Sequence, residues 1–325
     1  MISFERKYSF EEADDSLRFR VYVNYLVSIK NYLKSNYSTP NVLIDQISRT
    51  ASFRRIRMAQ SLDKGELSRV MRNAWLTELQ IYASSADREF IPYSNHWAPV
   101  QLYYQCYLSI RGLFLASGQS IRESHPAALK RISNEIRSRP DIFPYPWKVT
   151  YGGDPRKSGR YLNLPSSVTV NVISPLTTSR RVSFFDSFGL LLKTTRERQI
   201  DSALKEWKRK EHRKRLSAVE REYVIAGLHE TTFFDFLYRL RIRSNYTDAD
   251  SFLFSVKNRN DTLAFNQSIK SIGWYTMLLL EVLVAKYIGR DAFIGIADLF
   301  IKHAKSTLSN DVLCRRRNII NQATF

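Results

Sequence analysis

One stretch, residues 93–118, constrains the fold of this chain more than any other. It reads YSNHWAPVQLYYQCYLSIRGLFLASG, and its apolar residues spread around most of a helical wheel instead of forming one stripe. Ser94 or Asn95 is a candidate N-cap, Pro99 suits the first turn, and Gly118 suits the left-handed position after a helix. We therefore predict a central helix, defined at both ends and covered on several sides.

Arg111 is the only charged residue between Trp97 and Ser117. A guanidinium buried in such a helix needs a carboxylate partner, because an unpaired buried charge is costly. The sequence thus predicts that Arg111 is a structural anchor paired with an acid from another segment.

The chain is strongly basic. Its 325 residues carry 50 Lys and Arg against 31 Asp and Glu, a formal net charge of +19, and 44% hydrophobic residues are ample for a folded core. This excess favours a polyanionic partner such as nucleic acid, or an acidic protein, over a merely solvated surface. Cys106 and Cys314 form no CxxC or metal-binding spacing, which indicates a reducing, cytoplasmic setting.

The sequence does not predict a segment that enters or spans a membrane. The first residues, MISFERKYSFEEADDSLRF, lack the apolar centre of a signal peptide. The most apolar run, Ile272 to Ile288, is shorter than the roughly 20 residues of a membrane span and contains Glu281 and Lys286. We expect a buried core helix there and no membrane association.

Apolar periodicity predicts a mainly α fold in three regions: helices in 1–138, a Pro- and Gly-rich insertion in 139–195, and helices again in 196–325, together forming one composite domain. The predicted helices span 11–36, 41–62, 66–84, 125–138, 196–215, 232–243, 262–288, 291–305 and 310–321, with another starting at Ser217 and reaching His229, and a short one starting at Asp248 or Asp250. The Ser217 start is a capping box, SAVE.

The insertion holds six of the ten prolines, so helix is not expected through it. The β-branched run at 168–173, VTVNVI, predicts a strand that pairs with 181–185, RVSFF, as a small β-hairpin. The segment 152–159, GGDPRKSG, lacks the spacing and the strand-to-helix context of a phosphate-binding loop, and is predicted to be a surface turn.

Two basic clusters are candidate nucleic-acid-binding sites. Between residues 193 and 215 there are ten Lys or Arg and four Asp or Glu, and the densest cations are Lys208, Arg209, Lys210, Arg213, Lys214 and Arg215. The second cluster is Arg315, Arg316 and Arg317. Such groups bind phosphate backbones through counterion release without reading sequence, although a solvated helix is the alternative interpretation.

Two segments together resemble a known family. The run HWAPVQLYYQCYLSIRGLFLASG, followed by a histidine in the SHP turn at His125, is similar to the long helix of HEPN-like helical proteins, closest to the YaaC-like branch. The segment from Leu237 to Asp250, LYRLRIRSNYTDAD, resembles the arginine-then-aromatic segment of many HEPN domains. The resemblance implies an all-helical bundle of the kind found in bacterial toxin-antitoxin and antiphage systems, whose active members cleave RNA as dimers.

The chain departs from the catalytic pattern of those members, in which a histidine follows an arginine after four to six residues. No histidine stands at that spacing after Arg241 or Arg243. His125 lies far away in the sequence, and a lone histidine beside a turn is more often a cap or a packed ring. A divergent site would therefore have to be built from Arg241, Arg243, Asn245, Tyr246 and His125.

Three functions follow as hypotheses. The first is a non-catalytic nucleic-acid- or partner-binding component of a bacterial defence-type system. The alternative is a divergent, metal-independent HEPN-type ribonuclease that acts as a dimer, and the third is a structural subunit of a homodimer or hetero-complex with an acidic partner. Five scattered histidines, two distant cysteines and the lack of an HExxH motif predict no metal and no cofactor.

Overall fold

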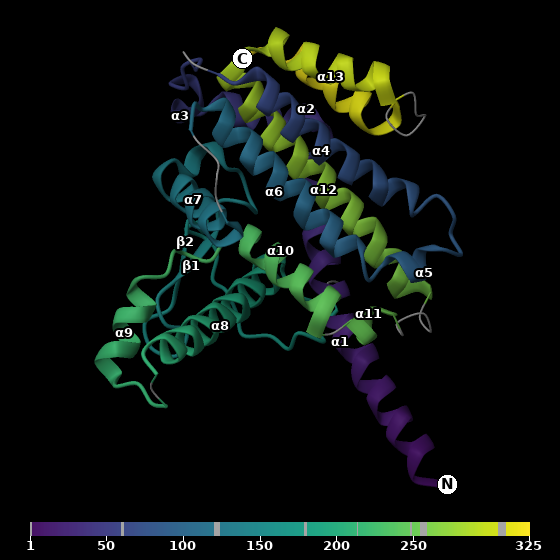
Figure 1. Cartoon of the computed structure of the whole chain (residues 1–325), viewed down its shortest axis with the longest axis vertical. Helices are drawn as coiled ribbons and strands as arrows, with labels where there is room; N and C mark the ends of the chain where they lie inside the picture. Colours follow the sequence, from purple (N-terminus) through teal and green to yellow (C-terminus); the bar gives the residue numbers. More distant parts are fainter. Residues whose placement is uncertain are drawn as a thin grey trace.

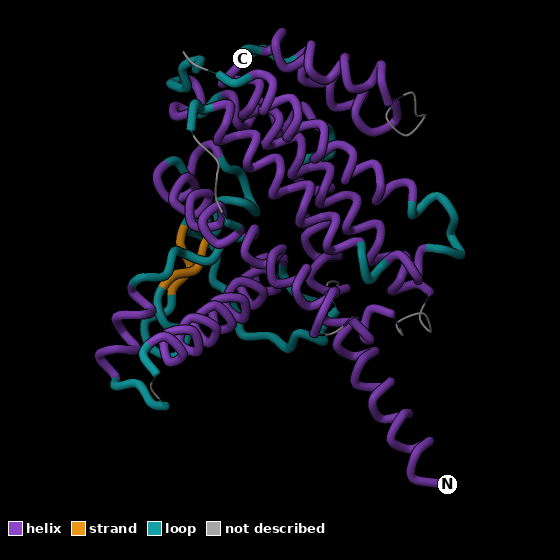
Figure 2. The backbone as a smooth tube through the Cα atoms, in the orientation of Figure 1, coloured by secondary structure: helices purple, strands orange, loops and turns teal. Residues whose placement is uncertain are grey.

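The computed structural model describes residues 2–59, 62–119, 124–178, 181–212, 214–247, 249–253, 259–304 and 310–325. Over these residues the protein is mainly helical, with one small two-stranded antiparallel sheet (Figures 1 and 2). The predicted fold class, a multi-helix bundle around a central apolar helix with a small β-hairpin, is thus confirmed.

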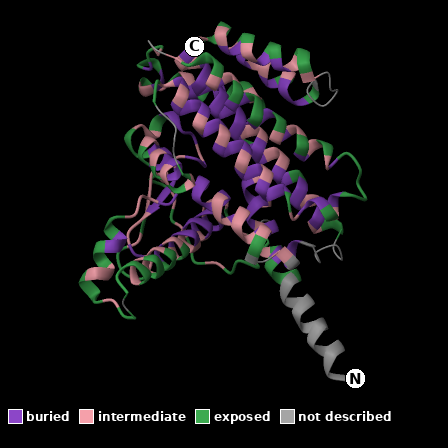
Figure 3. Cartoon of the chain, viewed as in Figure 1, coloured by how far each residue is buried: buried purple, intermediate pink, exposed green. Residues whose placement is uncertain are grey.

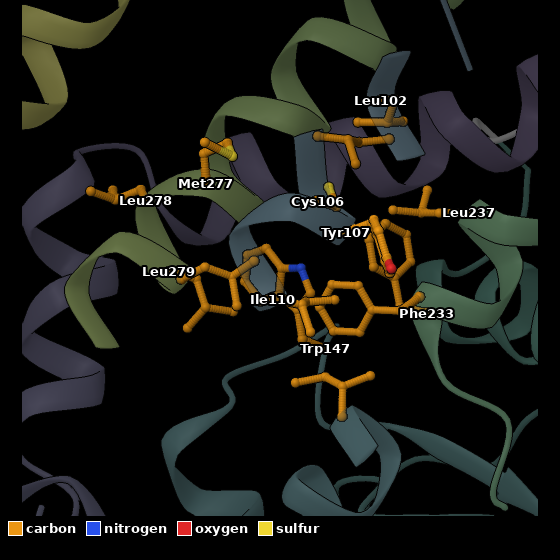
Figure 4. Packing of buried hydrophobic residues seen from close by; sticks show 14 of the residues in the cluster. Leu102, Cys106, Tyr107, Ile110, Trp147, Phe233, Leu237, Met277, Leu278 and Leu279 are labelled. Atoms are coloured by element: carbon orange, nitrogen blue, oxygen red, sulfur yellow. The ribbon is translucent and has the colours of Figure 1, made fainter. Parts of the chain in front are cut away.

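Four long helices form the core of the bundle. They are α1 (Ile2–Asn36), α4 (Lys64–Ala83), α6 (Ala98–Ala116) and α12 (Arg259–Ile288). Helix α6 packs against both α4 and α12, and α1 packs along α12. Figure 4 shows side chains of α6, including Cys106 and Ile110, between those of α12 and those of helix α10 (Phe233–Ile242).

The all-round apolar pattern of α6 produces the predicted burial, since 14 of its 19 residues are buried. Its ends differ partly from the prediction. Pro99 lies in the first turn, but neither Ser94 nor Asn95 caps the helix with its side chain, and Trp97 occupies the N-cap position. The amide of Asn95 donates instead to the carbonyl oxygen of Thr262, at 3.0 Å, and so ties the start of α6 to α12. Gly118 adopts φ +78°, the predicted left-handed conformation.

Arg111 does not have the predicted carboxylate partner. Among the described residues no acid pairs with it; its guanidinium carbon lies 6.0 Å from the centre of the Tyr107 ring, and its Nε atom is buried without a hydrogen bond. Arg111 is only partly buried. The anchor inside the bundle is another arginine, Arg316 of α15 (Arg315–Gln322).

Arg316 lies at the centre of a buried ionic network with Glu78 of α4 and Glu281 of α12. Its Nη1 and Nη2 atoms donate to the two carboxylate oxygens of Glu78 at 2.7 and 2.6 Å. Its Nε and Nη2 atoms donate to Glu281 at 2.9 and 3.0 Å, and the indole N–H of Trp75 donates to the same carboxylate at 2.8 Å. The network joins three helices that are far apart in the sequence.

On the same side of the bundle lie α13 (Arg290–Ala304) and the turn η4 (Asn310–Cys314), which leads into α15 (Figure 1). Helix α2 (Pro40–Ser48) and the short α3 (Ala51–Arg54) replace the single helix predicted over 41–62. The predicted helix is interrupted before Thr50. The hydroxyl of Thr50 accepts from the Phe53 N–H and so caps the start of α3. Helix α5 (Ile91–Ser94) precedes α6, and α7 (His125–Ser138) has the predicted bounds, followed by the turn η1 (Pro140–Ile142).

Helix α8 (Phe184–Lys210) begins twelve residues earlier than predicted, because Ser183 caps it by accepting from the Asp186 N–H. Helix α9 (Ala218–Ala226) starts with the predicted capping box between Ser217 and Glu220, but it ends at Ala226, short of His229. Together α8 and α9 extend away from the four-helix core (Figure 1), and Figure 3 shows mostly exposed residues at their far ends.

The β-hairpin lies elsewhere than predicted. Strands β1 (Thr150–Gly152) and β2 (Arg160–Leu162) pair in antiparallel register, and the predicted surface turn GGDPRKSG connects them. The run 168–173 has no regular secondary structure, and Phe184 and Phe185 belong to α8. The reason is local: the Asp186 carboxylate at the start of α8 accepts the backbone N–H of Asn171 at 2.6 Å, so this segment bonds to a helix end and not to a strand.

Arg196 fastens the hairpin and α9 to α8. Its side chain is buried, and its guanidinium donates to the carbonyl oxygens of Gly153 at 3.0 Å and His229 at 2.6 Å. Burial lowers the pKa of Arg196, and nearby acids led by Asp235 oppose that shift.

Between α9 and α12 lie α10, the π-helical turn η2 (Arg243–Thr247) and the short helix α11 (Ala249–Leu253). Asp248, one of the two predicted starts of this short helix, lies outside the described residues.

Helix α12 is the one described helix that is long and apolar enough to cross a membrane, and 83% of its most apolar window is buried inside the protein. The burial agrees with the prediction of a core helix at Ile272 to Ile288.

Candidate nucleic-acid interface

The predicted basic cluster near residue 210 lies at the exposed end of α8. The last buried residue of α8 is Ile200, and residues 201–212 are all exposed or half-buried. Arg209 and Lys210 both contact Glu206, at 2.8 and 3.5 Å, while their own side chains stay 74% and 67% exposed. These surface pairs hold the cations in place weakly and leave them accessible to a phosphate.

The other members of this cluster agree with that placement. Lys208 is half-buried, Lys214 and Arg215 are exposed, and Arg213 lies outside the described residues. We call the described cations of this cluster, namely Lys208, Arg209, Lys210, Lys214 and Arg215, the α8 basic end.

Aromatic rings flank the α8 basic end. The Trp207 and Tyr223 rings meet edge to face, with centroids 5.6 Å apart, and Tyr223 of α9 remains 68% exposed. An exposed ring beside several cations is the arrangement on which unpaired bases stack while the cations hold the backbone.

The C-terminal arginines do not form the predicted second cluster. Arg316 is fully buried and held by two carboxylates, so it has no surface to offer a phosphate. Arg317 pairs with Asp298 at 2.7 Å, and only Arg315 is exposed. Successive residues on a helix point about 100° apart, so three adjacent arginines cannot share one face.

A different group of side chains converges where α6, α7 and α10 meet. His125, at the start of α7, lies against the rings of Tyr103 and Tyr107, with ring centroids 5.4 and 4.3 Å apart. Its Nδ1 atom is 2.8 Å from the Tyr103 hydroxyl oxygen. Arg241 of α10 donates through Nη2 to the Tyr104 hydroxyl at 3.1 Å, and its guanidinium carbon lies 5.6 Å from the Tyr103 ring centre.

We call the group His125, Tyr103, Tyr104, Tyr107, Arg111 and Arg241 the His–Arg cluster. Burial lowers the pKa of His125, and the positive charges of Arg241 and Arg111 lower it further. Burial likewise raises the pKa of Tyr103, so its phenol stays protonated. At neutral pH the cluster therefore holds a neutral imidazole beside two arginine side chains. In the part of the chain that the structure describes, Arg241, like Arg111, forms no ion pair with a carboxylate, and its Nε atom is buried without a hydrogen bond.

The predicted divergent site is thus brought together only in part. His125 and Arg241 meet, although the sequence places them over a hundred residues apart. Arg243 faces away, because residues two apart on a helix point in nearly opposite directions, and it lines a cavity with α1 and α8. Tyr246 is 70% exposed, and in the described part of the chain neither it nor Asn245 contacts His125.

Sequence reasoning did not single out the tyrosines of this cluster. Their signal was present, because Tyr103 and Tyr107 stand four residues apart on α6 and therefore share a face. The sequence also did not predict the pairing of His229 with the buried Asp235, in which His229 Nε2 lies 2.8 Å from a carboxylate oxygen. Asp235 is fixed by the capping box that it forms with Thr232.

Within the residues that the structure describes, no group of three or more His, Cys, Asp or Glu side chains is placed to hold a metal ion. The protein is thus mainly helical and carries two cationic regions, the α8 basic end and the His–Arg cluster. No protein-family model, curated protein or solved structure matches the chain.

Proposed function

We propose that this protein binds nucleic acid through the α8 basic end. The observation that supports the proposal is that five described cations gather beyond the last buried residue of α8, where only surface acids accompany them. The cations of such a surface would release the counterions that are condensed on a phosphate backbone, which is a favourable source of affinity that does not depend on base sequence. Tyr223 adds a ring on which a base can stack.

We also propose that the helical bundle is HEPN-like and of the YaaC-like branch, and that the protein is a component of a bacterial defence-type system in the cytoplasm. Two resembling segments and the all-helical fold support this proposal. Such a component acts as a homodimer or with a partner subunit. An acidic partner protein would bind the same α8 basic end.

The test is fluorescence anisotropy of the full chain with a labelled 20-nucleotide RNA and the matching DNA, at salt concentrations from 50 to 200 mM. Four phosphate contacts on a single strand give a slope of log K against log salt of about −3. Replacing Arg209, Lys210, Lys214 and Arg215 with glutamine should remove most of that slope and of the affinity.

A matched control keeps the loss of net charge the same. Arg49, Arg54, Arg55 and Arg57 are also exposed, and they lie between α2 and the start of α4. Their replacement with glutamine should leave the slope nearly unchanged. Equal losses in the two variants would show that only overall charge matters, and an acidic protein that binds while RNA and DNA do not would replace nucleic acid as the partner.

The His–Arg cluster supports a second candidate function, metal-independent cleavage of RNA. In the tautomer in which Nδ1–H donates to the Tyr103 oxygen, Nε2 of His125 is free to take the proton of a ribose 2′-hydroxyl. Attack of that oxygen on the adjacent phosphorus forms a five-coordinate phosphorane. The bond from phosphorus to the 5′-oxygen then breaks, the 5′-oxygen takes a proton from water, and a 2′,3′-cyclic phosphate is left behind. Arg241 and Arg111 would stabilise the charge of the phosphorane.

The test is cleavage of labelled RNA in the presence of a chelator, with His125→Ala and Arg241→Ala as variants. Because the pKa of His125 is lowered from its usual 6.5, the base form dominates at neutral pH. The rate should therefore rise with pH, be half-maximal below pH 6.5 and be flat at neutral pH and above. Arg72→Ala gives a matched control, because Arg72 is exposed and, among the described residues, bonds to the Ser68 carbonyl oxygen of its own helix. Undiminished cleavage by the His125 variant would remove this function.

A further inference from the structure

A cavity of about 730 Å³ opens beside α12, between the end of α1, the end of α4 and the start of α15. Three aromatic rings and three cations line it: Tyr82, Trp274, Tyr275, Lys34, Lys270 and Arg315. Among the described residues of the lining, Asp311 is the only acid. We call this cavity the α12 pocket.

Lys270 is the one half-buried cation among the described residues of the lining. Its ammonium nitrogen lies 5.7 Å from the centre of the Tyr82 ring, and in the described part of the chain it forms neither an ion pair nor a hydrogen bond. Burial lowers the pKa of Lys270, as expected for a charge that has lost water without gaining a carboxylate. An anionic group in the pocket would supply the missing partner.

Tyr82 brings a second hydrogen-bond donor close to Lys270. Burial raises the pKa of Tyr82, and the negative charge of Glu78 adds to the rise, so the phenol stays protonated. Its hydroxyl forms no hydrogen bond with another described residue. An ammonium and a phenol can both donate to the oxygens of one anion.

Trp274 and Tyr275 form an aromatic wall. Their rings meet edge to face with centroids 5.2 Å apart, and the Tyr275 hydroxyl donates to the Tyr37 carbonyl oxygen at 2.9 Å, which fixes its ring. The guanidinium carbon of the exposed Arg315 lies 5.7 Å from the centre of the Trp274 ring. Rings held in place beside cations suit a ligand that combines a planar ring with a negative charge.

The charges at the pocket favour an anion of low charge. The lining carries three cations and one acid, and the buried network of Arg316 with Glu78 and Glu281 lies directly behind it, with the Arg316 guanidinium carbon 6.0 Å from the centre of the Trp274 ring. With both carboxylates of the network ionised, these groups together have a net charge of +1. One phosphate group matches this balance better than a chain of phosphates does.

The size of the pocket narrows the class of ligand further. About 730 Å³ lies within the range of small-molecule sites and exceeds what a single phosphate ion fills. We propose that the α12 pocket binds a nucleoside monophosphate, with its base against Trp274 and Tyr275 and its phosphate at Lys270 and Tyr82. This binding is separate from the contact of nucleic acid with the α8 basic end, because no residue of the pocket belongs to that surface.

The first test is isothermal titration calorimetry of the full chain, in a phosphate-free buffer, with AMP, GMP, CMP, UMP, adenosine and orthophosphate. We expect one site per chain for at least one of the four monophosphates. If that ligand is AMP, adenosine and orthophosphate should each bind at least about tenfold more weakly, because each lacks half of the contacts; for another base, its own nucleoside replaces adenosine. Equal affinity for the nucleoside or for orthophosphate would overturn the proposal, as would binding of none of the four.

Variants locate the site. Lys270→Met removes the charge and keeps the length of the side chain, so binding should weaken roughly tenfold to a hundredfold, the loss of one charge-assisted contact. The thermal midpoint should not fall, because the charge that is removed is half-buried and unpaired. Trp274→Leu should weaken binding more than Trp274→Phe, which keeps a ring. Lys130→Met, at an exposed position of α7, removes the same charge and should bind as the parent chain does.

Lysine acetylation read by mass spectrometry tests the contact without a substitution. The bound monophosphate should slow the labelling of Lys270 and leave the labelling of Lys130 unchanged. Equal losses of binding in the Lys270 and Lys130 variants, or labelling of Lys270 at the same rate in the saturated protein, would overturn the proposal. The glutamine variant of the α8 basic end should keep its affinity for the monophosphate, and a loss equal to that of Lys270→Met would likewise contradict a separate site.

Discussion

Replacing Arg316 with alanine should destabilise the protein more than any surface substitution. The guanidinium is completely buried, and it is the cation that neutralises both Glu78 and Glu281. Removing it leaves two buried carboxylates of like charge, together with a cavity the size of the missing side chain. The hydrogen bond from Trp75 to Glu281 then remains as one neutral donor for a full negative charge.

The magnitude follows from the loss of one partner of a buried ion pair, which costs about 3–5 kcal/mol. For a chain of 325 residues the entropy of unfolding is about 0.7 kcal/mol per kelvin, so the thermal midpoint should fall by roughly 4–7 °C. Circular dichroism during heating measures this shift. Arg315→Ala, one residue away but exposed, should change the free energy of unfolding by about 0.5 kcal/mol or less.

The pH dependence gives the sharper test. Burial already raises the pKa of Glu78, and Arg316 opposes that rise, so removing Arg316 should raise the pKa further. A carboxyl with a raised pKa in the folded state binds more protons folded than unfolded, so the stability of the variant should increase as the pH falls from 8 toward 5. A deficit below about 1 kcal/mol, or one that is constant over this range, would refute the ionic account of the network.

Three further predictions concern packing, capping and reactivity. Thr232→Ala removes the capping box of α10 and should cost about 1 kcal/mol of unfolding free energy, measured by urea denaturation against Thr232→Ser. Gly112→Ala places a Cβ atom 2.5 Å from the Met71 sulfur, and the overpacking should cost about 1–3 kcal/mol by the same measurement unless Met71 is also shortened. Burial raises the pKa of the Cys106 thiol, so a thiol reagent should modify Cys314 in the folded protein and both cysteines only in denaturant.

Patterns that act within one helix were sufficient to predict much of the fold. The all-round apolar residues of α6 required partners on several sides, and α4, α12 and α10 provide them. The capping box at Ser217 and the left-handed Gly118 were predicted correctly because both depend on a few adjacent residues. The hairpin was misplaced because β-branching at 168–173 indicated a strand, whereas the cap of α8 at Asp186 holds that segment in another way.

The sites depended on contacts between distant segments, which no local pattern contains. Three adjacent arginines suggested an external cluster at 315–317, although helical geometry already required that they point in different directions. The same geometry turns Arg241, on α10, and Arg243, the first residue of η2, in nearly opposite directions. The approach of His125 to Arg241 could not be predicted, because it depends on how α7 and α10 each pack against α6.

The length of α8 separates its basic end electrostatically from the four-helix core. Ten residues separate Ile200 from Lys210, a helical distance of about 15 Å, which is close to twice the screening length of about 8 Å at physiological ionic strength. Ions in the solvent therefore largely screen an anion at the α8 basic end from the charges of the four-helix core. Changes in the four-helix core, including modifications that alter its charge, can accumulate without altering what the α8 basic end attracts.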